Sequence, residues 1–369
     1  MESAAAKRSW WRTLLLRITT ILWFLGGVAF LLSLPIALQA SPLVMVVIIV
    51  IACSLAAFAV WLVRFVRGAG TDRAAWPKTA VGLTFALTIL VASPVYYFAT
   101  ITQVTPAMVP QATLTNGVRT IVFQGMQHVG TEPFYKSVVY DLESALSDDY
   151  ALFYEGVRPA NPADDAWFDR TVTGGADLGT TYRDLAGLCG LRFQNDYFGL
   201  LARDARLHPA SHVVADVSTA DLHAEYDRLM RTDAVFADAM REKERARAGA
   251  GSVKPDGLER IVAFMRSGTD GQREIGGVLC RGFMTLVMRK DASADSEDQS
   301  EKLILDYRNR VLARALLDDP RPRIYVTYGA KHLPGVLRLL QRNDPRWRIA
   351  SVKWLRTIDR PDDLTGTIR

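Results

Sequence analysis

The sequence predicts a protein of two parts: an N-terminal region of three transmembrane helices, followed by an α/β domain with a mostly parallel central sheet and helical insertions. Three observations predict this fold class. No charged residue occurs between Arg17 and Arg64, and a second long uncharged stretch follows Lys78. From Arg119 onward, short apolar runs alternate with amphipathic stretches, as they do in chains of β-α-β units.

Three apolar segments are each long enough to cross a bilayer, which takes about 20 residues in a helix. We expect spans at about 18–39, 43–63 and 81–101. Four basic residues precede the first span and four lie in the loop 64–78, whereas the other span ends have none. Because basic loops stay in the cytoplasm, this pattern predicts a multi-pass cell-membrane protein with a cytoplasmic N-terminus, an extracytoplasmic C-terminal domain and the lipid bilayer as a partner. A buried helical hairpin is the alternative, and the length of the uncharged run disfavours it.

The net charge of +5 is concentrated before Arg119, where eight basic and two acidic residues lie. The remainder is nearly neutral and lacks the basic surface of a nucleic-acid-binding protein. Three cysteines are too few for a disulfide-rich scaffold, although Cys189 and Cys280 leave one pairing open. The expected organisation is a membrane anchor at 1–101, a linker at 102–118, an α/β domain at 119–356 and a C-terminal tail at 357–369.

The elements of the α/β domain are expected where apolar residues recur with the period of a strand or of a helix. The expected strands are 120–125, 151–157, 212–217, 323–328 and 347–354. Thr131 and Pro133 are typical of a helix start, with Thr131 as the N-cap. Further helices are expected at 218–248, 255–267, 298–318 and 333–342. The uncharged, proline-containing segment 102–117 predicts a linker.

Two of the five histidines occur in the same local pattern, each where an expected strand gives way to a helix. The first is Gly125–His128 and the second is Gly329–His332, while Glu155 lies at the end of a third expected strand. Because ligands bind at the carboxyl ends of parallel strands, these side chains are expected to meet in one crevice. Two imidazoles and a carboxylate are typical of a metal site with open positions. Taken alone, each histidine favours the role of a hydrogen-bonded turn residue, and Glu155 favours a salt-bridge or helix-cap role. The joint pattern favours a shared site.

Two further stretches strengthen this pattern. Tyr307-Arg308-Asn309 precedes a helix that leads into the last strands, and residues 329–335 have the form Gly-x-x-His-Leu-x-Gly. Together with Gly125–His128 and Glu155, they resemble the TraB/PrgY/GumN family, which includes the Tiki membrane-tethered metalloproteases and is distantly related to the erythromycin esterases. The resemblance covers about residues 119–356 and is poor between about 158 and 300.

The resemblance implies a peptidase-like hydrolase that uses a divalent metal (Mn, Co or Zn) and acts on a peptide or on a small amide or ester. It implies His128, Glu155 and His332 as metal ligands, and Glu155 and Arg308 as catalytic residues. The motif-supporting residues would be Gly125, Gly329, Asn309 and Gly335, with Asp216 behind the site.

Two mechanisms and a second class of function stay open. A bound metal would acidify water and polarise a scissile carbonyl, with Arg308 holding the oxyanion or a substrate carboxylate. Alternatively, Glu155 would act as a general base without a metal, and the histidines would transfer protons. In the second class, the chain is a non-enzymatic membrane protein that binds or sequesters a signal peptide or another small molecule. Neither the substrate nor the oligomeric state follows from the sequence.

Overall fold

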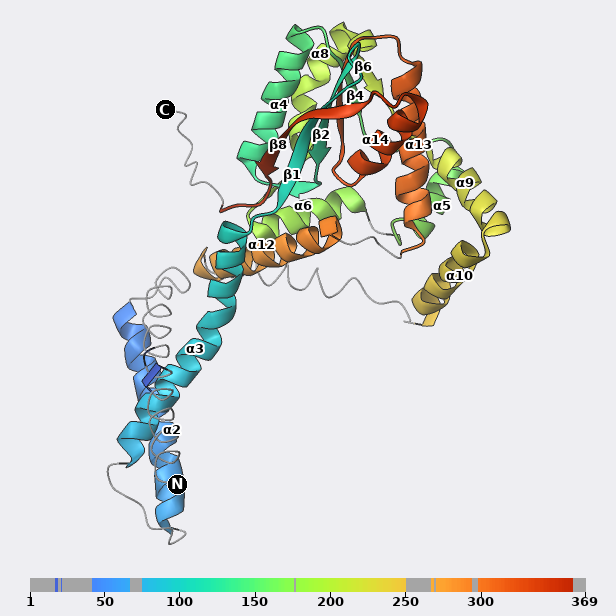
Figure 1. Cartoon of the computed structure of the whole chain (residues 1–369). Coiled ribbons are helices and arrows are strands. Elements are labelled where there is room, and N and C mark those ends of the chain that lie inside the picture. The colour runs from blue at the N-terminus through green and yellow to red at the C-terminus, as the bar shows by residue number, and fades with distance from the viewer. Residues whose placement is uncertain are drawn as a thin grey trace, which may run out of the picture. The chain divides into compact units, whose positions relative to one another are not determined.

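The computed structural model describes residues 17–18, 21, 42–66, 75–175, 177–249, 267–268, 270–293 and 298–360. The chain forms two compact units, one of Met1–Ile101 with Ala263–Phe283 and one of Thr102–Val262 with Met284–Arg369. Figure 1 labels their helices and strands. The helix expected at 255–267 and the tail expected at 357–369 lie mostly outside the described residues.

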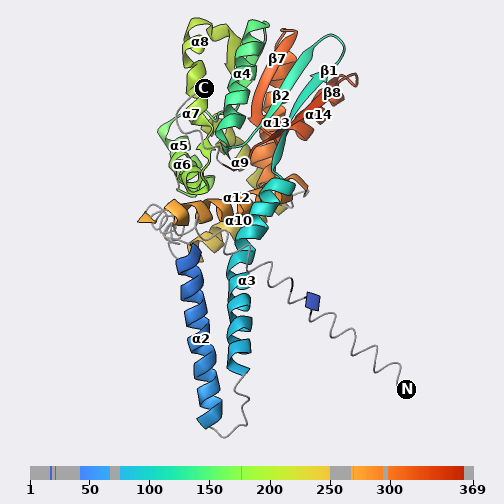
Figure 2. The same cartoon turned by 90° about the vertical axis from the view of Figure 1, so that its left-hand side faces the viewer.

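The first unit contains the long helix α2 (Pro42–Val66) and most of α3 (Ala75–Val104), both drawn in Figure 2. None of the described helices is both long enough and apolar enough to cross a membrane. The spans predicted at 43–63 and 81–101 are therefore contradicted. The prediction of a multi-pass membrane protein with an extracytoplasmic domain depends on these spans, and it is contradicted as well. The span predicted at 18–39 lies almost entirely outside the described residues.

The second unit is built on a six-stranded sheet in the order β6-β4-β7-β2-β1-β8. Its strands are β1 (Met108–Thr115), β2 (Thr120–Met126), β4 (Ala151–Tyr154), β6 (His212–Val214), β7 (Arg323–Gly329) and β8 (Arg348–Arg356). The strands β2, β7, β4 and β6 are parallel, but β1 is antiparallel to both β2 and β8. The sheet is therefore mixed, which corrects the prediction of a mostly parallel sheet. A small second sheet pairs β3 (Val129–Gly130) with β5 (Arg192–Phe193).

Strand β1 explains why the sheet is mixed. It lies in the segment 102–117, whose prolines and lack of charge predict a linker. A short turn at 116–119 leads from β1 into β2, and a turn of this length joins antiparallel strands. Pro110 is tolerated because it lies beyond the last β1–β2 pair and is paired only with Trp354 of β8.

The helices alternate with the strands along the second unit. They are α4 (Glu132–Ser147), α5 (Pro162–Thr171), α6 (Leu178–Cys189), α7 (Asn195–Phe198), α8 (Ala202–Leu207), α9 (Thr219–Thr232), α10 (Ala234–Gly249), α13 (Arg308–Asp318) and α14 (His332–Asn343), together with part of α12 (Asp270–Ser293). Two 3₁₀ turns, η1 (Gly199–Leu201) and η2 (Pro209–Ser211), and a π-helical turn, η3 (Lys302–Tyr307), complete the description. Cys53 is a free thiol and Cys189 is disulfide-bonded.

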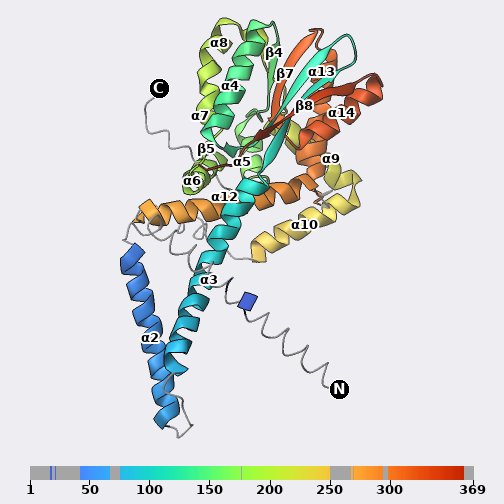
Figure 3. The same ribbon diagram turned by 60° about the vertical axis from the view of Figure 1, so that its left-hand side comes forward.

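Helices cover both faces of the sheet, so the second unit has three layers (Figure 3). Successive residues of a strand point to opposite faces, and β7 shows this alternation. Ile324 and Val326 pack in the same core as Leu312 of α13, whereas Tyr325 packs in a second core with Val138 of α4. A third apolar cluster lies among α9, α10 and η3.

Most of the expected elements are present, with shifted ends. The strands predicted at 120–125, 151–157 and 323–328 are confirmed as β2, β4 and β7, and the last predicted strand is β8. The helix start at Thr131 is confirmed, since its hydroxyl accepts a hydrogen bond from the Phe134 amide. The strand predicted at 212–217 ends earlier, as β6, and the helix predicted at 218–248 is divided into α9 and α10.

Replacing Phe123 by Ala should lower the free energy of unfolding by about 3–5 kcal/mol, because this fully buried side chain would leave a cavity that the sheet cannot close. Urea unfolding followed by circular dichroism measures the change. The control is Tyr140→Ala on α4, at a position that is 69% exposed, and it should cost less than about 0.5 kcal/mol. Equal losses in both variants would contradict this assignment of the core.

Candidate functional site

The two Gly-x-x-His motifs are neighbours because β2 and β7 are adjacent parallel strands. Met126 is in register with Gly329, and the Ala330 amide donates a hydrogen bond to the Met126 carbonyl oxygen at 3.2 Å. A β-carbon on Gly125 would lie 2.9 Å from the Pro110 oxygen and 3.0 Å from the β-carbon of Ala330. The first glycine therefore allows the second motif to approach closely, so both turns leave the sheet at the same edge.

Glu155 lies at this edge because it directly follows β4, the other neighbour of β7. Its amide donates to the Thr327 oxygen at 3.0 Å, and its Oε2 accepts the Gly329 amide hydrogen at 2.5 Å. A β-carbon on Gly329 would lie 3.4 Å from this Oε2 and 3.3 Å from Cδ2 of His332. The second glycine thus leaves room where the acid and the imidazole approach each other.

Glu155 is held by an ion-pair network whose other members, Arg308 and Asp216, are buried. Arg308 is the first residue of α13, directly after the π-helical turn η3. Its Nε donates to Oδ1 of Asp216 at 2.9 Å, and its Nη2 donates to Oδ2 of Asp216 at 2.5 Å and to Oε1 of Glu155 at 2.7 Å. Asp216 also accepts the backbone amide hydrogens of Gly156 and Val217. The side chain of Asp216 is fully buried, whereas 22% of the Glu155 side chain is exposed.

The pKa values of the pair follow from this contact. Burial alone would raise the pKa of Asp216, but the hydrogen bonds and positive charge of Arg308 outweigh burial, and that pKa is lowered. Burial alone would lower the pKa of Arg308, but Asp216 and Glu155 outweigh it, and that pKa is raised. Both groups are therefore charged at neutral pH. Arg308 was expected to hold an oxyanion or a substrate carboxylate; the structure places its fork on Asp216 and Glu155, where it positions Glu155.

His332 is buried and makes a fixed contact with the neighbouring helix. Its Nδ1 lies 2.8 Å from Oδ1 of Asn309 on α13, and its ring packs edge-on against Tyr328. Since an amide oxygen only accepts, Nδ1 carries the proton and Nε2 keeps its lone pair. A β-carbon on Gly335, one turn along α14, would collide with Nδ2 of Asn309. The Gly-x-x-His-Leu-x-Gly pattern therefore describes the space that Asn309 needs to orient the imidazole.

Burial makes His332 a neutral base. It lowers the pKa of His332 to about 4, although the negative charge of Glu155 opposes this effect. The imidazole is therefore uncharged at pH 7.

His128 lies on the exposed side of the same edge. Its Nδ1 accepts a hydrogen bond from Nε2 of Gln194 at 2.8 Å, and its ring packs against Tyr182 with centroids 4.5 Å apart. Although part of its surface is exposed, desolvation by the surrounding protein lowers the pKa of His128, an effect that Glu155 opposes and Arg308 supports. Gln194 and Tyr182 lie in the region where the sequence carries no recognisable pattern, so no local signal identifies them.

The prediction of a metal-binding protein is contradicted. Within the described part of the chain, no three His, Cys, Asp or Glu side chains are grouped so that they could hold a metal ion. The predicted ligands follow three different strands, and their side chains are not brought together as such a group. Each also has a contact within the protein: Nδ1 of His128 with Gln194, Nδ1 of His332 with Asn309, and the Glu155 carboxylate with Arg308 and Gly329.

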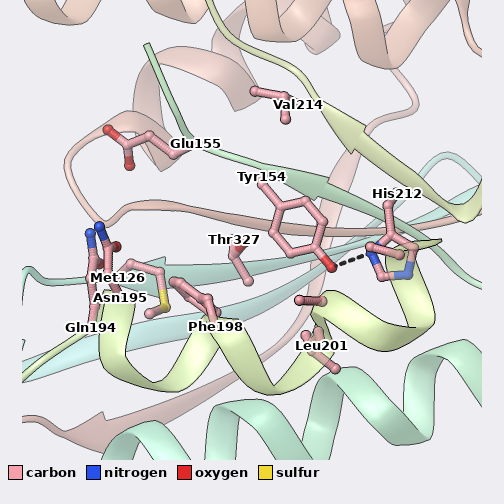
Figure 4. Close-up of a pocket in the computed structure, with 12 residues that line it drawn as sticks. Met126, Tyr154, Glu155, Gln194, Asn195, Phe198, Leu201, His212, Val214 and Thr327 are labelled. Carbon is pink, nitrogen blue, oxygen red and sulfur yellow. Dashed lines mark hydrogen bonds between the residues drawn. The ribbon is translucent and has the colours of Figure 1, made fainter. Parts of the chain in front are cut away.

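A cavity of about 370 Å³ opens beside Glu155, on the face of the sheet that α7 and α8 cover (Figure 4). It is lined by Met126, Tyr154, Glu155, Gln194, Asn195, Phe198, Leu201, Ala202, Ala205, His212, Val214 and Thr327. Sequence patterns did not identify His212 as a site residue, because nothing local distinguishes it from other histidines. Comparison with protein-family models, with curated proteins and with solved structures found no match for this chain.

Replacing Arg308 by Met should cost about 3–5 kcal/mol of unfolding free energy, because it leaves the buried carboxylate of Asp216 without its charged partner. The control is Arg310→Met, which removes a 46% exposed partner of Glu225 while Arg228 stays in place, and it should cost at most about 1 kcal/mol. Chemical denaturation at pH 7 measures both. A cost below that of the control would contradict the structural importance of the Arg308 pair.

The lowered pKa of His332 predicts a loss of stability in acid. Between pH 6.5 and 4 the unfolded chain binds a proton at this residue and the folded chain does not, so the stability present above pH 6.5 is lost as the pH falls. The loss from this group is about 3 kcal/mol at pH 4. Denaturation of wild type and His332→Gln at pH 7.5 and pH 4 measures this contribution. Between these pH values the variant should lose about 3 kcal/mol less unfolding free energy than wild type. Equal losses in the two proteins would contradict the prediction.

Proposed function

We propose that the protein is a hydrolase that cleaves a peptide, amide or ester bond at the site formed by Glu155, His128 and His332. One observation carries the proposal: a charged arginine and the Gly329 amide hold the Glu155 carboxylate against the turn that bears His332, at the wall of a cavity. Fixed acid–base groups beside a cavity are typical of active sites. The same residues carry the resemblance to the TraB/PrgY/GumN family, which we propose as the origin of the site.

Glu155 is the general base in this proposal. A carboxylate has about four lone-pair positions, so two remain after its hydrogen bonds to Arg308 and Gly329. Glu155 takes a proton from a water molecule, and the water oxygen bonds to the carbonyl carbon of the substrate. The carbon–nitrogen or carbon–oxygen bond then breaks, and the proton passes from Glu155 to the leaving atom. Glu155 is an ionised carboxylate again at the end of the cycle.

The remaining residues orient this reaction. Arg308 ties Glu155 to the buried Asp216, so the carboxylate keeps one position. His332 is neutral at pH 7 and offers Nε2 as a hydrogen-bond acceptor, while Asn309 holds the ring through Nδ1. His128 borders the site from its exposed side. No step of this mechanism uses a metal.

A binding function is the second candidate. The observation in its favour is that both Glu155 oxygens already have partners, as a carboxylate with a purely structural role would have. On this view the cavity holds a signal peptide or another small molecule without cleaving it. Measurements of turnover decide between the two.

Incubating the purified full chain with a mixture of short peptides and with p-nitrophenyl esters should produce cleavage, detected by mass spectrometry and absorbance. Glu155→Gln should lower kcat/KM by about 10²–10⁴-fold, the usual contribution of a general base. Glu143→Gln, the same change at an exposed position of α4, is the matched control and should keep full activity.

Each reaction is run with EDTA and with Mn²⁺, Co²⁺ or Zn²⁺. Cleavage in EDTA that depends on Glu155 supports the proposed mechanism, whereas cleavage only with added metal contradicts it. Peptides that bind the chain and are recovered intact in all conditions would favour the binding function.

A further inference from the structure

The cavity beside Glu155 is continuous with the proposed site but has a different chemical character. Its floor comes from the carboxyl ends of β2, β4, β6 and β7, and its cover comes from α7, η1 and α8. Figure 4 shows Glu155 at one end and His212 at the other, with Tyr154 and Phe198 between them. The described lining includes no lysine or arginine. Its apolar members are Met126, Phe198, Leu201, Ala202, Ala205 and Val214.

The polar groups of the wall already have partners within the protein. The Tyr154 hydroxyl lies 2.8 Å from Nδ1 of His212, whose Nε2 lies 2.7 Å from Oδ2 of Asp204. Because a carboxylate only accepts, Nε2 of His212 carries a proton, and the Tyr154 hydroxyl and Nδ1 share the other hydrogen bond. Burial raises the pKa of Tyr154, so the phenol stays neutral.

Two further polar groups of the lining are engaged: the Thr327 hydroxyl donates to the Phe153 oxygen, and Nε2 of Gln194 donates to His128. Glu155 keeps free lone pairs at one end of the cavity, and Asn195 is exposed. Along the apolar part of the wall, a polar or charged group would lose its hydration without gaining a hydrogen-bond partner, which costs free energy. An apolar occupant loses nothing and buries its surface.

We infer that this cavity receives an uncharged, bulky apolar side chain next to the bond hydrolysed at Glu155, so that the substrates are peptides or amino-acid esters with a leucine- or phenylalanine-like residue at that position. The inference rests on the proposed function. A volume of about 370 Å³ is at the lower end of the range of ligand pockets, about 300–1,000 Å³, and suits one such side chain. The carboxylate of Glu155 at one end disfavours an acidic residue.

A series of N-acetyl amino-acid p-nitrophenyl esters tests the preference. The esters of Gly, Ala, Leu, Phe and Asp differ only in the side chain, and kcat/KM for Leu and Phe should exceed that for Ala by about 10–200-fold. Ala205→Leu adds a larger side chain on α8 and so narrows the cavity. It should reduce the ratio of kcat/KM for the Phe ester to that for the Ala ester at least about 10-fold. The matched control is Ala163→Leu, at an exposed position of α5 outside the lining, which should leave the ratio unchanged.

A binding measurement keeps the test independent of catalysis. N-acetyl-phenylalaninamide and N-acetyl-aspartamide are titrated calorimetrically into wild type, Ala205→Leu and Ala163→Leu, after thermal unfolding has shown that each variant is folded. The phenylalanine compound should bind wild type and Ala163→Leu, and should bind Ala205→Leu at least about 10-fold more weakly.

The outcomes separate the two proposals. Two outcomes overturn the inference on the cavity but not the proposed hydrolase activity. One is hydrolysis that depends on Glu155 and shows no side-chain preference. The other is a ratio of kcat/KM for the Phe and Ala esters that Ala205→Leu does not change. Binding of the phenylalanine compound that Ala205→Leu weakens, without hydrolysis of any ester, supports the cavity and overturns the hydrolase. Equal binding of both compounds, or binding of neither, overturns the inference on the cavity.

Discussion

The contact of Arg308 with Asp216 and Glu155 is the interaction on which the rest of the site depends. Asp216 and Glu155 follow neighbouring parallel strands, so without a cation between them two carboxylates would repel each other in a partly dehydrated space. The single positive charge of Arg308 contacts both carboxylates and offsets one of their two negative charges, and Arg308 connects the ends of these strands to α13. Arg308 directly follows the π-helical turn η3, a kind of turn that is frequent at functional sites.

Close backbone approach is the second constraint, and three glycines satisfy it at different contacts. Gly125 makes room for Ala330 of the other motif, Gly329 for Glu155, and Gly335 for Asn309. In each case a β-carbon would meet the group that the site requires at that place. The glycines are thus explained by the space they leave rather than by flexible backbone. Replacing Gly329 or Gly335 would displace a side chain of the site, and replacing Gly125 would push the two turns apart.

The parts of the fold that sequence patterns predict are those that depend on local periodicity. The strands β2, β4 and β7 have uninterrupted apolar runs, and Thr131 caps α4 through its own side chain. Strand β1 is not predicted, because its composition is that of a linker. It is a strand because it pairs with β2 and β8. The predicted spans rest on composition alone, and none of the described helices is long and apolar enough to cross a membrane.

The sequence alone determined that Gly-x-x-His turns and a glutamate end three strands, because strand ends and tight turns depend on neighbouring residues. Only the tertiary structure decided what the side chains of these turns contact. It directs Nδ1 of His128 to Gln194 and Nδ1 of His332 to Asn309, and places the Glu155 carboxylate against Arg308. These partners come from segments far apart along the chain, and hydrogen-bond direction and desolvation depend on where such segments meet in space.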